Sequence, residues 1–424
     1  MEEPIGSERE EGVSLGLTAA QSEFWLAHEL SPGGSSNRIA QFVDLDGALD
    51  VSLMKRSVRQ ALDECEPMRC RFVASGAELR QIVETADDWE LPVIDLSTQP
   101  DPSGAAGAWI DAILRRPLDL QAGRLYEHAL LQLGATRWRL FLSAHHIVID
   151  GAGGALFVQR IDEVYTRLCA GLRVGESWFG TLQEVVDSET AYRQGSPRFD
   201  KDRAFWTEHM SNAPESVRLA GGPKPRTLAS QLRAVSRLSE NQFHDVRHLA
   251  TRLGASVPAV LAAATSILLH QAGRSDDVVL GLPVTGRSSV SRRTPAALAN
   301  LLPMRLRVFG SMTASELIAQ AADEILAVLR RQHYRGVDIA RDLGIRGGLH
   351  ALVSMQLNFM AFDYDLDFAG CAAEHQVVSI GNILDTAITA ITDHATDGLE
   401  VTLYGNTDLF DQDTIAGWMG MWRR

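Results

Sequence analysis

Residues 145–151 constrain the fold of this chain most, because one short turn there joins two different backbone patterns. The run before it, residues 138–144, is apolar and aromatic, as expected of a buried strand. After the turn, apolar residues recur at helical spacing until Gly171, a candidate stop signal. The sequence therefore predicts a buried strand, a tight turn and a long amphipathic helix, an arrangement typical of α/β proteins. The helical positions are Phe157, Ile161, Val164, Tyr165 and Leu168.

The turn carries side chains that can do chemistry. His145 and His146 lie at the strand end, Asp150 precedes the helix, and Gly151 stands where the backbone must be permissive. Strand-to-helix turns direct functional groups outward. A neutral imidazole at such a place can accept a proton from an attacking amine or alcohol. We therefore take His146, His145, Asp150 and Gly151 as the candidate catalytic residues.

Composition limits the class of protein. The 424 residues, 45% of them hydrophobic and 22% charged, are ordinary for a globular protein of two or three domains. The net charge of −14 argues against nucleic-acid binding as the main role. The cysteines form no CxxC pair and no metal-like spacing, so we interpret them as thiols in a reducing compartment. They are Cys65, Cys70, Cys169 and Cys371.

The sequence carries no recognisable targeting segment. The polar, acidic N-terminus lacks the basic and apolar regions of a signal peptide. The longest apolar stretch, residues 257–269, is too short to span a bilayer. We expect a cytoplasmic protein that does not bind a membrane.

Breaks in the pattern divide the chain into two α/β blocks of similar size. Residues 1–14 are a predicted disordered leader, residues 15–176 an N-terminal lobe that carries the histidine motif, and residues 177–424 a C-terminal lobe truncated near its end. Residues 211–230, rich in Pro and Gly, are a predicted loop, and Ser239 opens a capping box for the next helix. Two such blocks predict a two-lobed molecule with a cleft between the lobes.

Written as HHxxxDG, residues 145–151 resemble the active-site signature of the condensation domains of nonribosomal peptide synthetases. The wider superfamily, which includes the chloramphenicol acetyltransferase-like acyltransferases, shares the shorter HxxxD pattern. The resemblance implies an α/β fold, an α+β sandwich, in which two chloramphenicol acetyltransferase-like lobes form a pseudo-dimeric V with a central cleft.

Further stretches resemble other condensation-domain motifs in the expected order over nearly the whole chain. The fourth motif, expected around residues 181–192, is weak. The matches are Thr18, Gln21 and Trp25 (TxxQxxxW); Glu66, Arg69 and Phe72 (ExLRxxF); Gly286 and Arg287; Asn300, Pro303 and Arg305 (FVNTLPLR); residues 333–338; residues 358–364; and residues 384–388.

The resemblance implies roles for the histidines and for the glycine. His146 accepts the proton of an acceptor amine, or holds that amine against a thioester carbonyl, while His145 supports the strand end. General base catalysis contributes roughly 10²–10⁴-fold, and orientation contributes as much or more. The Gly151 N–H is expected to face the forming oxyanion, where one well-placed donor has a large effect.

The resemblance also implies structural and channel residues. Asp150 is expected to point away from the substrate and to pair with an arginine, for which Arg287 is the first candidate and Arg69 the second. Loss of either partner would leave an uncompensated buried charge. Asn300 and Thr386 are candidate polar groups of the substrate channel; each is otherwise a loop residue with its hydrogen bonds satisfied.

The substrates that the resemblance implies are thioesters on the phosphopantetheine arms of donor and acceptor carrier proteins. The donor acyl group passes to the acceptor amine, and the domain needs no cofactor or metal of its own. An adjacent adenylation domain and a monomeric state are expected, with no binding of nucleic acid.

The basic residues Arg330, Arg331, Arg335 and Arg341 are either a carrier-docking patch or a solvated helix face. The short leader before the first motif favours an initiating domain that accepts an acyl or aryl starter.

Three other readings share the fold or the motif. An epimerization domain has the same signature but follows a carrier domain. A stand-alone acyltransferase would form an ester or amide with a free acceptor, and a non-catalytic recruitment domain usually has a broken motif. A Ser–His–Asp hydrolase is disfavoured because the sequence has no GxSxG elbow.

Overall fold

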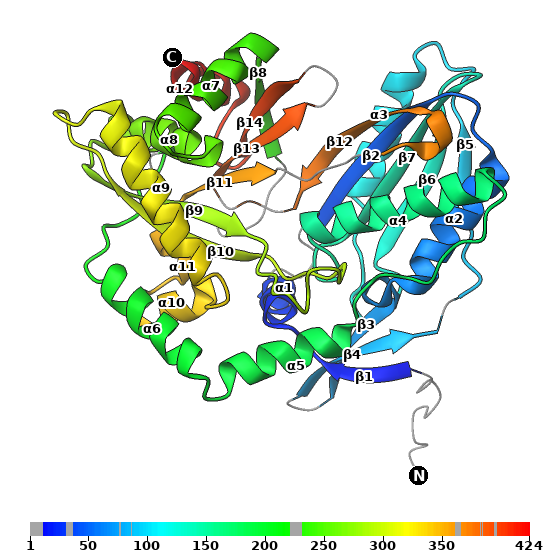
Figure 1. Cartoon of the computed structure of the whole chain (residues 1–424), viewed down its shortest axis with the longest axis horizontal. Coiled ribbons are helices and arrows are strands. Elements are labelled where there is room, and N and C mark those ends of the chain that lie inside the picture. The colour runs from blue at the N-terminus through cyan, green and yellow to red at the C-terminus, as the bar shows by residue number, and fades with distance from the viewer. Residues whose placement is uncertain are drawn as a thin grey trace.

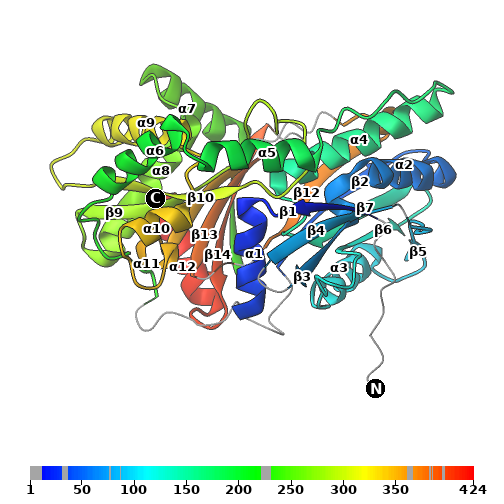
Figure 2. The same ribbon diagram turned by 90° about the horizontal axis from the view of Figure 1, so that it is seen from below.

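The computed structural model describes residues 12–30, 37–75, 78–85, 87–220, 231–360, 366–381, 383, 385–393 and 397–424. Two lobes lie side by side, and Figures 1 and 2 show helices α5 and α6 running beneath them with α1 between them. The bounds of these three helices are Ala19–Leu30 for α1, Leu182–Arg193 for α5 and Pro197–His209 for α6.

The N-terminal lobe is built on a mostly antiparallel sheet with the strand order β12-β2-β7-β6-β5. A smaller sheet, β1-β4-β3, lies beside it. The strands are β1 (Gly12–Gly16), β2 (Arg38–Asp46), β3 (Cys70–Ser75), β4 (Glu78–Glu84), β5 (Val93–Asp95), β6 (Tyr126–Gln132), β7 (Arg137–His145) and β12 (Ala372–Ile380).

Helices cover both faces of the N-terminal sheet. On one face α2 (Val51–Glu64) and α4 (Gly151–Cys169) bury Val58, Phe157 and Ile161 against Leu140 and Leu142 of β7. On the other face α3 (Pro102–Leu114) packs against the alternate residues of the same strands. The period-two alternation of β7 therefore places its even-numbered residues toward α4, where the motif turn lies.

The C-terminal lobe repeats this plan with the strand order β10-β9-β11-β13-β14-β8. Strand β11 runs parallel to β9 and β13. The strands are β8 (Gln231–Leu238), β9 (Asp277–Val284), β10 (Asn300–Arg307), β11 (Met355–Met360), β13 (Thr386–Asp393) and β14 (Gly398–Asn406). The helices are α7 (Glu240–Arg252), α8 (Val257–Gly273), α9 (Ala314–Arg330), α10 (Gly336–Asp342), α11 (Leu349–Leu352) and α12 (Gln412–Arg423).

Local signals predicted several of these elements well. Helix α2 begins after Asp50, whose side chain accepts the Leu53 N–H as its N-cap. The capping box at Ser239 is present at the start of α7. Ser256 precedes α8 but makes no side-chain cap bond. The capping box at Ser239 therefore satisfies N–H groups at the start of α7 that have no partner within the helix.

The predicted lobe boundaries need correction. Residues 12–14, assigned to the leader, form part of β1 and pair with β4. Strand β12, assigned to the C-terminal lobe by its position in the sequence, pairs with β2 along the edge of the N-terminal sheet (Figure 1). Leu182 and Val185 of α5 also pack in the N-terminal core. Segments from the C-terminal part of the sequence therefore complete the N-terminal lobe, and neither lobe is one continuous segment.

Candidate functional site

The histidine motif lies at the end of the central strand of the N-terminal sheet, since β7 runs between β2 and β6 and ends at the turn into α4. The His146 N–H donates to the Asn37 carbonyl at 2.7 Å, which ties the turn to the start of β2. Nδ1 of His145 accepts the N–H of Ile147 at 3.0 Å. Burial lowers the pKa of His145 to about 3, so its ring is neutral and supports the turn.

His146 is held between two elements from distant parts of the sequence. The Phe24 ring of α1 stacks on its imidazole, with centroids 4.5 Å apart and planes at 25°. Gly381, after β12, has φ of +84°, and a Cβ there would lie 2.9 Å from Cδ2 of His146. Burial lowers the pKa of His146 below its ordinary value, and the nearby Asp150 opposes that shift. The imidazole is therefore neutral at physiological pH and able to accept a proton.

Asp150 joins the two lobes. Its carboxylate accepts hydrogen bonds from both terminal nitrogens of Arg287, at 2.8 and 2.9 Å. It also accepts hydrogen bonds from the backbone N–H groups of Gly153, Leu298 and Ala299, at 2.7, 2.9 and 2.9 Å. Burial alone would raise the pKa of Asp150, but Arg287 and these N–H groups hold it below the ordinary value. A carboxylate with this many donors stays ionised and is committed to structure.

Arg287 reaches Asp150 from the loop between β9 and β10 of the C-terminal lobe. Gly286 makes that approach possible, because its φ is +62° and a Cβ there would lie 2.2 Å from the Leu298 carbonyl oxygen. The second candidate partner, Arg69, donates to the Glu84 carbonyl instead. Of the two arginines named from the sequence, Arg287 is the partner and Arg69 is not.

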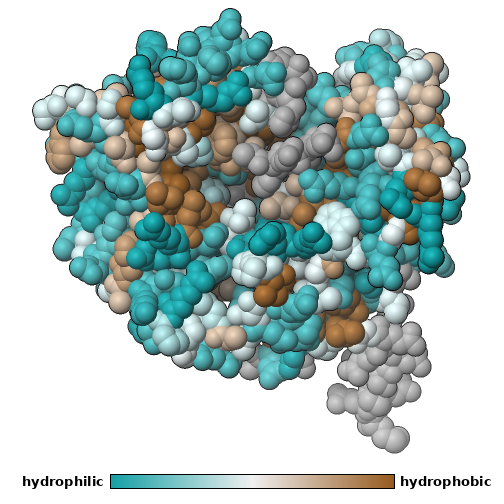
Figure 3. Space-filling view, in the orientation of Figure 1, coloured by the Kyte–Doolittle hydropathy of each residue, from teal (hydrophilic) through white to brown (hydrophobic). Residues whose placement is uncertain are grey.

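A cavity of about 210 Å³ lies between the lobes and contains His146 in its wall. Gly151 also lines it, as the first residue of α4, where the N–H groups have no partner within the helix. Figure 3 shows hydrophobic residues at the hollow between the lobes and a mainly hydrophilic outer surface. Both lobes contribute to the wall: Met68, His128, Leu142 and Phe157 from the N-terminal lobe, and Pro283, Gln356, Asn358 and Phe359 from the C-terminal lobe.

The two residues predicted to line a substrate channel lie outside this wall. Asn300 is 3% exposed, and its amide binds the carbonyls of Gln332 and Tyr334 and the N–H of Gly336. Thr386 is 2% exposed and donates to the Ser354 carbonyl. Both predictions are corrected: each side chain points into its own lobe, because strand alternation gives the cavity to the neighbours of these residues instead.

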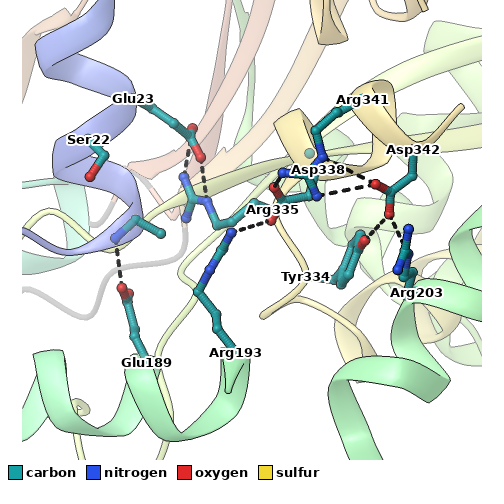
Figure 4. Close-up of polar contacts among 12 residues, drawn as sticks. Ser22, Glu23, Glu189, Arg193, Arg203, Tyr334, Arg335, Asp338, Arg341 and Asp342 are labelled. Carbon is teal, nitrogen blue, oxygen red and sulfur yellow. Dashed lines mark hydrogen bonds and ion pairs between the residues drawn. The ribbon is translucent and has the colours of Figure 1, made fainter. Parts of the chain in front are cut away.

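The predicted docking patch is also corrected. Arg335 is buried and binds Glu23 of α1 through two bonds, of 2.6 and 2.8 Å. Arg341 binds Asp338 at 2.7 Å, and the guanidinium carbon of Arg331 lies 3.5 Å from the centre of the Phe205 ring. Figure 4 shows that the contacts of Arg335 and Arg341 belong to a polar network joining α1, α5, α6 and α10. Arg331 and Arg335 contact neighbouring helices, whereas Arg341 pairs with carboxylates of its own helix α10, and none of these three is a free cation.

In the described ranges, no group of three or more His, Cys, Asp or Glu side chains could hold a metal ion. No single helix in the same ranges is long and apolar enough to cross a membrane, although the bent pair α7 and α8 passes on length and composition.

Sequence reasoning missed three residues at the site: Phe24, Gly381 and His128. Phe24 lies beside the conspicuous Trp25, and its helical position gives no sign of contact with residues 145–151. Gly381 was one glycine among many, and only its positive φ marks it. His128 follows Glu127 in β6, and no pattern in the sequence separates it from an ordinary strand residue.

Comparisons with known proteins agree with this geometry. The family model for the condensation domain matches residues 14–424. A mutant starter condensation domain of rhizomide synthetase RzmA, in complex with C8-CoA and Leu-SNAC, is 31% identical, with a TM-score of 0.89 over 97% of this chain and 93% of that chain. The first condensation domain of the CDA synthetase is 30% identical, with a TM-score of 0.89 over 97% and 95%. These matches confirm the predicted fold.

Curated relatives are much longer than this chain. A dimodular nonribosomal peptide synthase of Bacillus subtilis (strain 168) is 36% identical over 95% of this chain and 17% of its own length. The isonitrile lipopeptide synthase of Streptomyces coeruleorubidus is 35% identical over 94% and 27%, and enterobactin synthase component F of Escherichia coli (strain K12) is 30% identical over 95% and 31%. The chain thus spans less than a third of each relative. Its motif, its fold and this match over nearly its whole length show that it belongs to the condensation-domain family of nonribosomal peptide synthetases.

Proposed function

We propose that this domain transfers an acyl group from a donor thioester to the amine of an acceptor aminoacyl thioester, forming an amide bond. Both substrates are carried on the phosphopantetheine arms of carrier proteins. The observation that carries the proposal is the cavity whose wall contains His146 together with residues of both lobes. Two substrates that enter from opposite sides can meet at that imidazole.

In the proposed step, the acceptor amine attacks the donor carbonyl and the thiolate of the donor arm leaves. The neutral His146 accepts the amine proton, or holds the amine in line, and that proton ends on the departing thiolate. We expect the N–H of Gly151, which lines the same cavity, to stabilise the oxyanion. His145 and Asp150 keep the turn in shape and exchange no proton with substrate.

Membership of the condensation-domain family supports the proposed partners. We expect a donor carrier, an acceptor carrier and an adenylation domain in a larger synthetase, with the domain acting as a monomer because one chain builds both walls. We propose an initiating role with an acyl or aryl donor, and the likeness to a starter condensation domain solved with C8-CoA supports the acyl case.

Two loaded carriers test this proposal. One carrier is charged with an acyl thioester and the other with an aminoacyl thioester, and the acceptor carrier is followed by intact-protein mass spectrometry. Growth of the acceptor by the mass of the acyl group supports the function. Transfer to a free amine, with none to the loaded carrier, would favour a stand-alone acyltransferase.

A further inference from the structure

Ser379, near the end of β12, carries a hydroxyl that makes two hydrogen bonds at the edge of the cavity. It lies in the cavity wall together with His146. Strand β12 has one extra residue against β2 at this point, because Val377 stands opposite Gln41 whereas Ser379 stands opposite Ala40. Such a β-bulge redirects a strand, and bulges are frequent beside active sites. The bulge therefore sets where the last residues of β12 lie relative to the cavity.

The Ser379 hydroxyl replaces a ladder bond where the pairing of β12 with β2 ends. Ile380, opposite Ile39, is the last residue in register. The next position along the two strands brings together Gly381 and Arg38. Here the Gly381 N–H donates to Oγ of Ser379 at 3.3 Å, and that hydroxyl donates to the Arg38 carbonyl at 2.8 Å. The hydroxyl therefore joins the backbone of Gly381 to that of β2.

The start of β2, to which this link attaches, is firmly held. Arg38 is buried, and its guanidinium binds a backbone carbonyl and a carboxylate of the N-terminal lobe. The neighbouring carbonyl of Asn37 accepts the His146 N–H at 2.7 Å. The start of β2 therefore holds the backbone of His146 directly and the backbone of Gly381 through Ser379.

Gly381 in turn bounds the edge of the His146 ring that faces chemistry. A Cβ at this glycine would lie 2.9 Å from Cδ2 and 3.8 Å from Nε2 of the imidazole. Nδ1 of the same ring is buried, so Nε2 is the nitrogen left for a substrate. The Gly381 carbonyl accepts a hydrogen bond from Gln231, the first residue of β8. The Gly381 backbone beside Nε2 is thus held by the N-terminal lobe through Ser379 and by the C-terminal lobe through Gln231.

We propose that Ser379 is a positioning residue for the transfer reaction: it fixes Gly381 against the imidazole edge and so holds Nε2 of His146 at one place in the cavity wall. Without the hydroxyl, the Gly381 N–H loses its acceptor, the backbone shifts and the ring gains room to turn. Phe24 still stacks on the ring, so the ring is loosened rather than released. The inference rests on the proposed function, in which His146 moves or orients the amine proton.

Substitution of Ser379 tests the effect on the reaction. A misplacement of about 1 Å costs a rate about 100-fold, so Ser379→Ala, with Phe24 still in place, should lower the single-turnover rate at saturating carriers by about 10-fold. The KM for each carrier should change by less than about 2-fold, because the variant moves the imidazole and not the bound carriers. Ser379→Thr keeps the hydroxyl and should restore most of the rate. Gln376→Ala is the matched control: this exposed side chain of the same strand binds Glu374, and its loss should leave the rate unchanged.

A double variant tests whether Ser379 acts through His146. Residues that act as a unit are not additive, so Ser379→Ala should cause no further loss in a His146→Ala protein, whose slow residual transfer is followed over longer times. A loss of about 10-fold in both backgrounds would mean that Ser379 acts on the substrates or on the fold, and would overturn the inference.

The His146 ring is also observed directly, by NMR of protein labelled at Cε1 of its histidines, with the His146 signal identified by its loss in His146→Ala. Ser379→Ala should shift or broaden this signal, and Gln376→Ala should leave it in place. An unchanged signal in a folded Ser379→Ala protein, or an unchanged rate where the wild type is active, would overturn the inference. A shifted signal in proteins that show no transfer, wild type included, would instead defeat the proposed function and leave the positioning of His146 by Ser379 standing.

Discussion

Among single residues, Asp150 is the clearest test of the contact between the lobes, because one substitution there removes its ion pair with Arg287. Asp150→Ala leaves Arg287 buried without its partner and removes the cap of α4, so we expect a loss of about 3–5 kcal/mol in the free energy of unfolding. Because the folded-state pKa of Asp150 is lowered, its stabilisation is present above its unfolded pKa of about 4 and is lost as the pH falls through the folded value.

Urea unfolding measures this loss. Arg287→Ala is the matched variant, and the double variant should lose less than the sum of the two, because each single change already breaks the same pair. A fully stable but inactive Asp150→Ala protein would place Asp150 in the chemistry and contradict its structural role.

The environment of His146 predicts a pH profile. Burial lowers its pKa below the ordinary 6.5, so the acid limb of kcat/KM should fall below that pH. Phe24→Ala removes the ring stacked on His146 and admits water, and should move the limb up toward 6.5. Phe24→Leu, which keeps the cover, should move it less. Identical profiles in all three proteins would show that Phe24 does not shield the imidazole.

At the scale of elements, the pair of Arg335 and Glu23 holds α1 against the C-terminal lobe. Arg335→Ala should lower the free energy of unfolding by about 2–3 kcal/mol, less than for a fully buried pair because Glu23 is 31% exposed. Arg341→Ala, at a side chain 63% exposed, should change it by at most about 1 kcal/mol. Equal effects in thermal or urea unfolding would contradict the distinction between a buried tie and a surface pair.

The segment directly after β12, at Gly381, is a second element that affects the site, because it lies against His146. Gly381→Ala forces a side chain into positive φ and against His146 and Asn37, so we expect kcat to fall by about 10–100-fold. Gly171→Ala is a fair control, since its φ is also positive, +66°, but nothing lies within 4 Å of the added Cβ. If both variants lose activity equally, crowding of His146 is not the cause.

At the scale of the whole molecule, local pattern accounts for much of the fold, and long-range pairing for what it misses. The turn at residues 145–151, the helix Val51–Glu64 and the cap at Ser239 depend on neighbours in sequence and were predictable. The crossing of β12 pairs residues more than 300 positions apart, and no local signal marks it. Asn300 and Arg335 were misassigned because composition does not tell which way a side chain points. The motif turn was the reliable part of the site.

The central claim is that one cavity with a neutral His146 in its wall forms the amide bond. Its most direct test is single-turnover transfer between two loaded carriers, followed by intact-protein mass spectrometry, for the wild type and His146→Ala. We expect the rate to fall by at least about 100-fold in the variant with unchanged thermal unfolding, because the proposed function gives His146, in the cavity wall, the role of moving or orienting the amine proton. A folded His146→Ala protein that transfers the acyl group at a rate near that of the wild type would contradict the account.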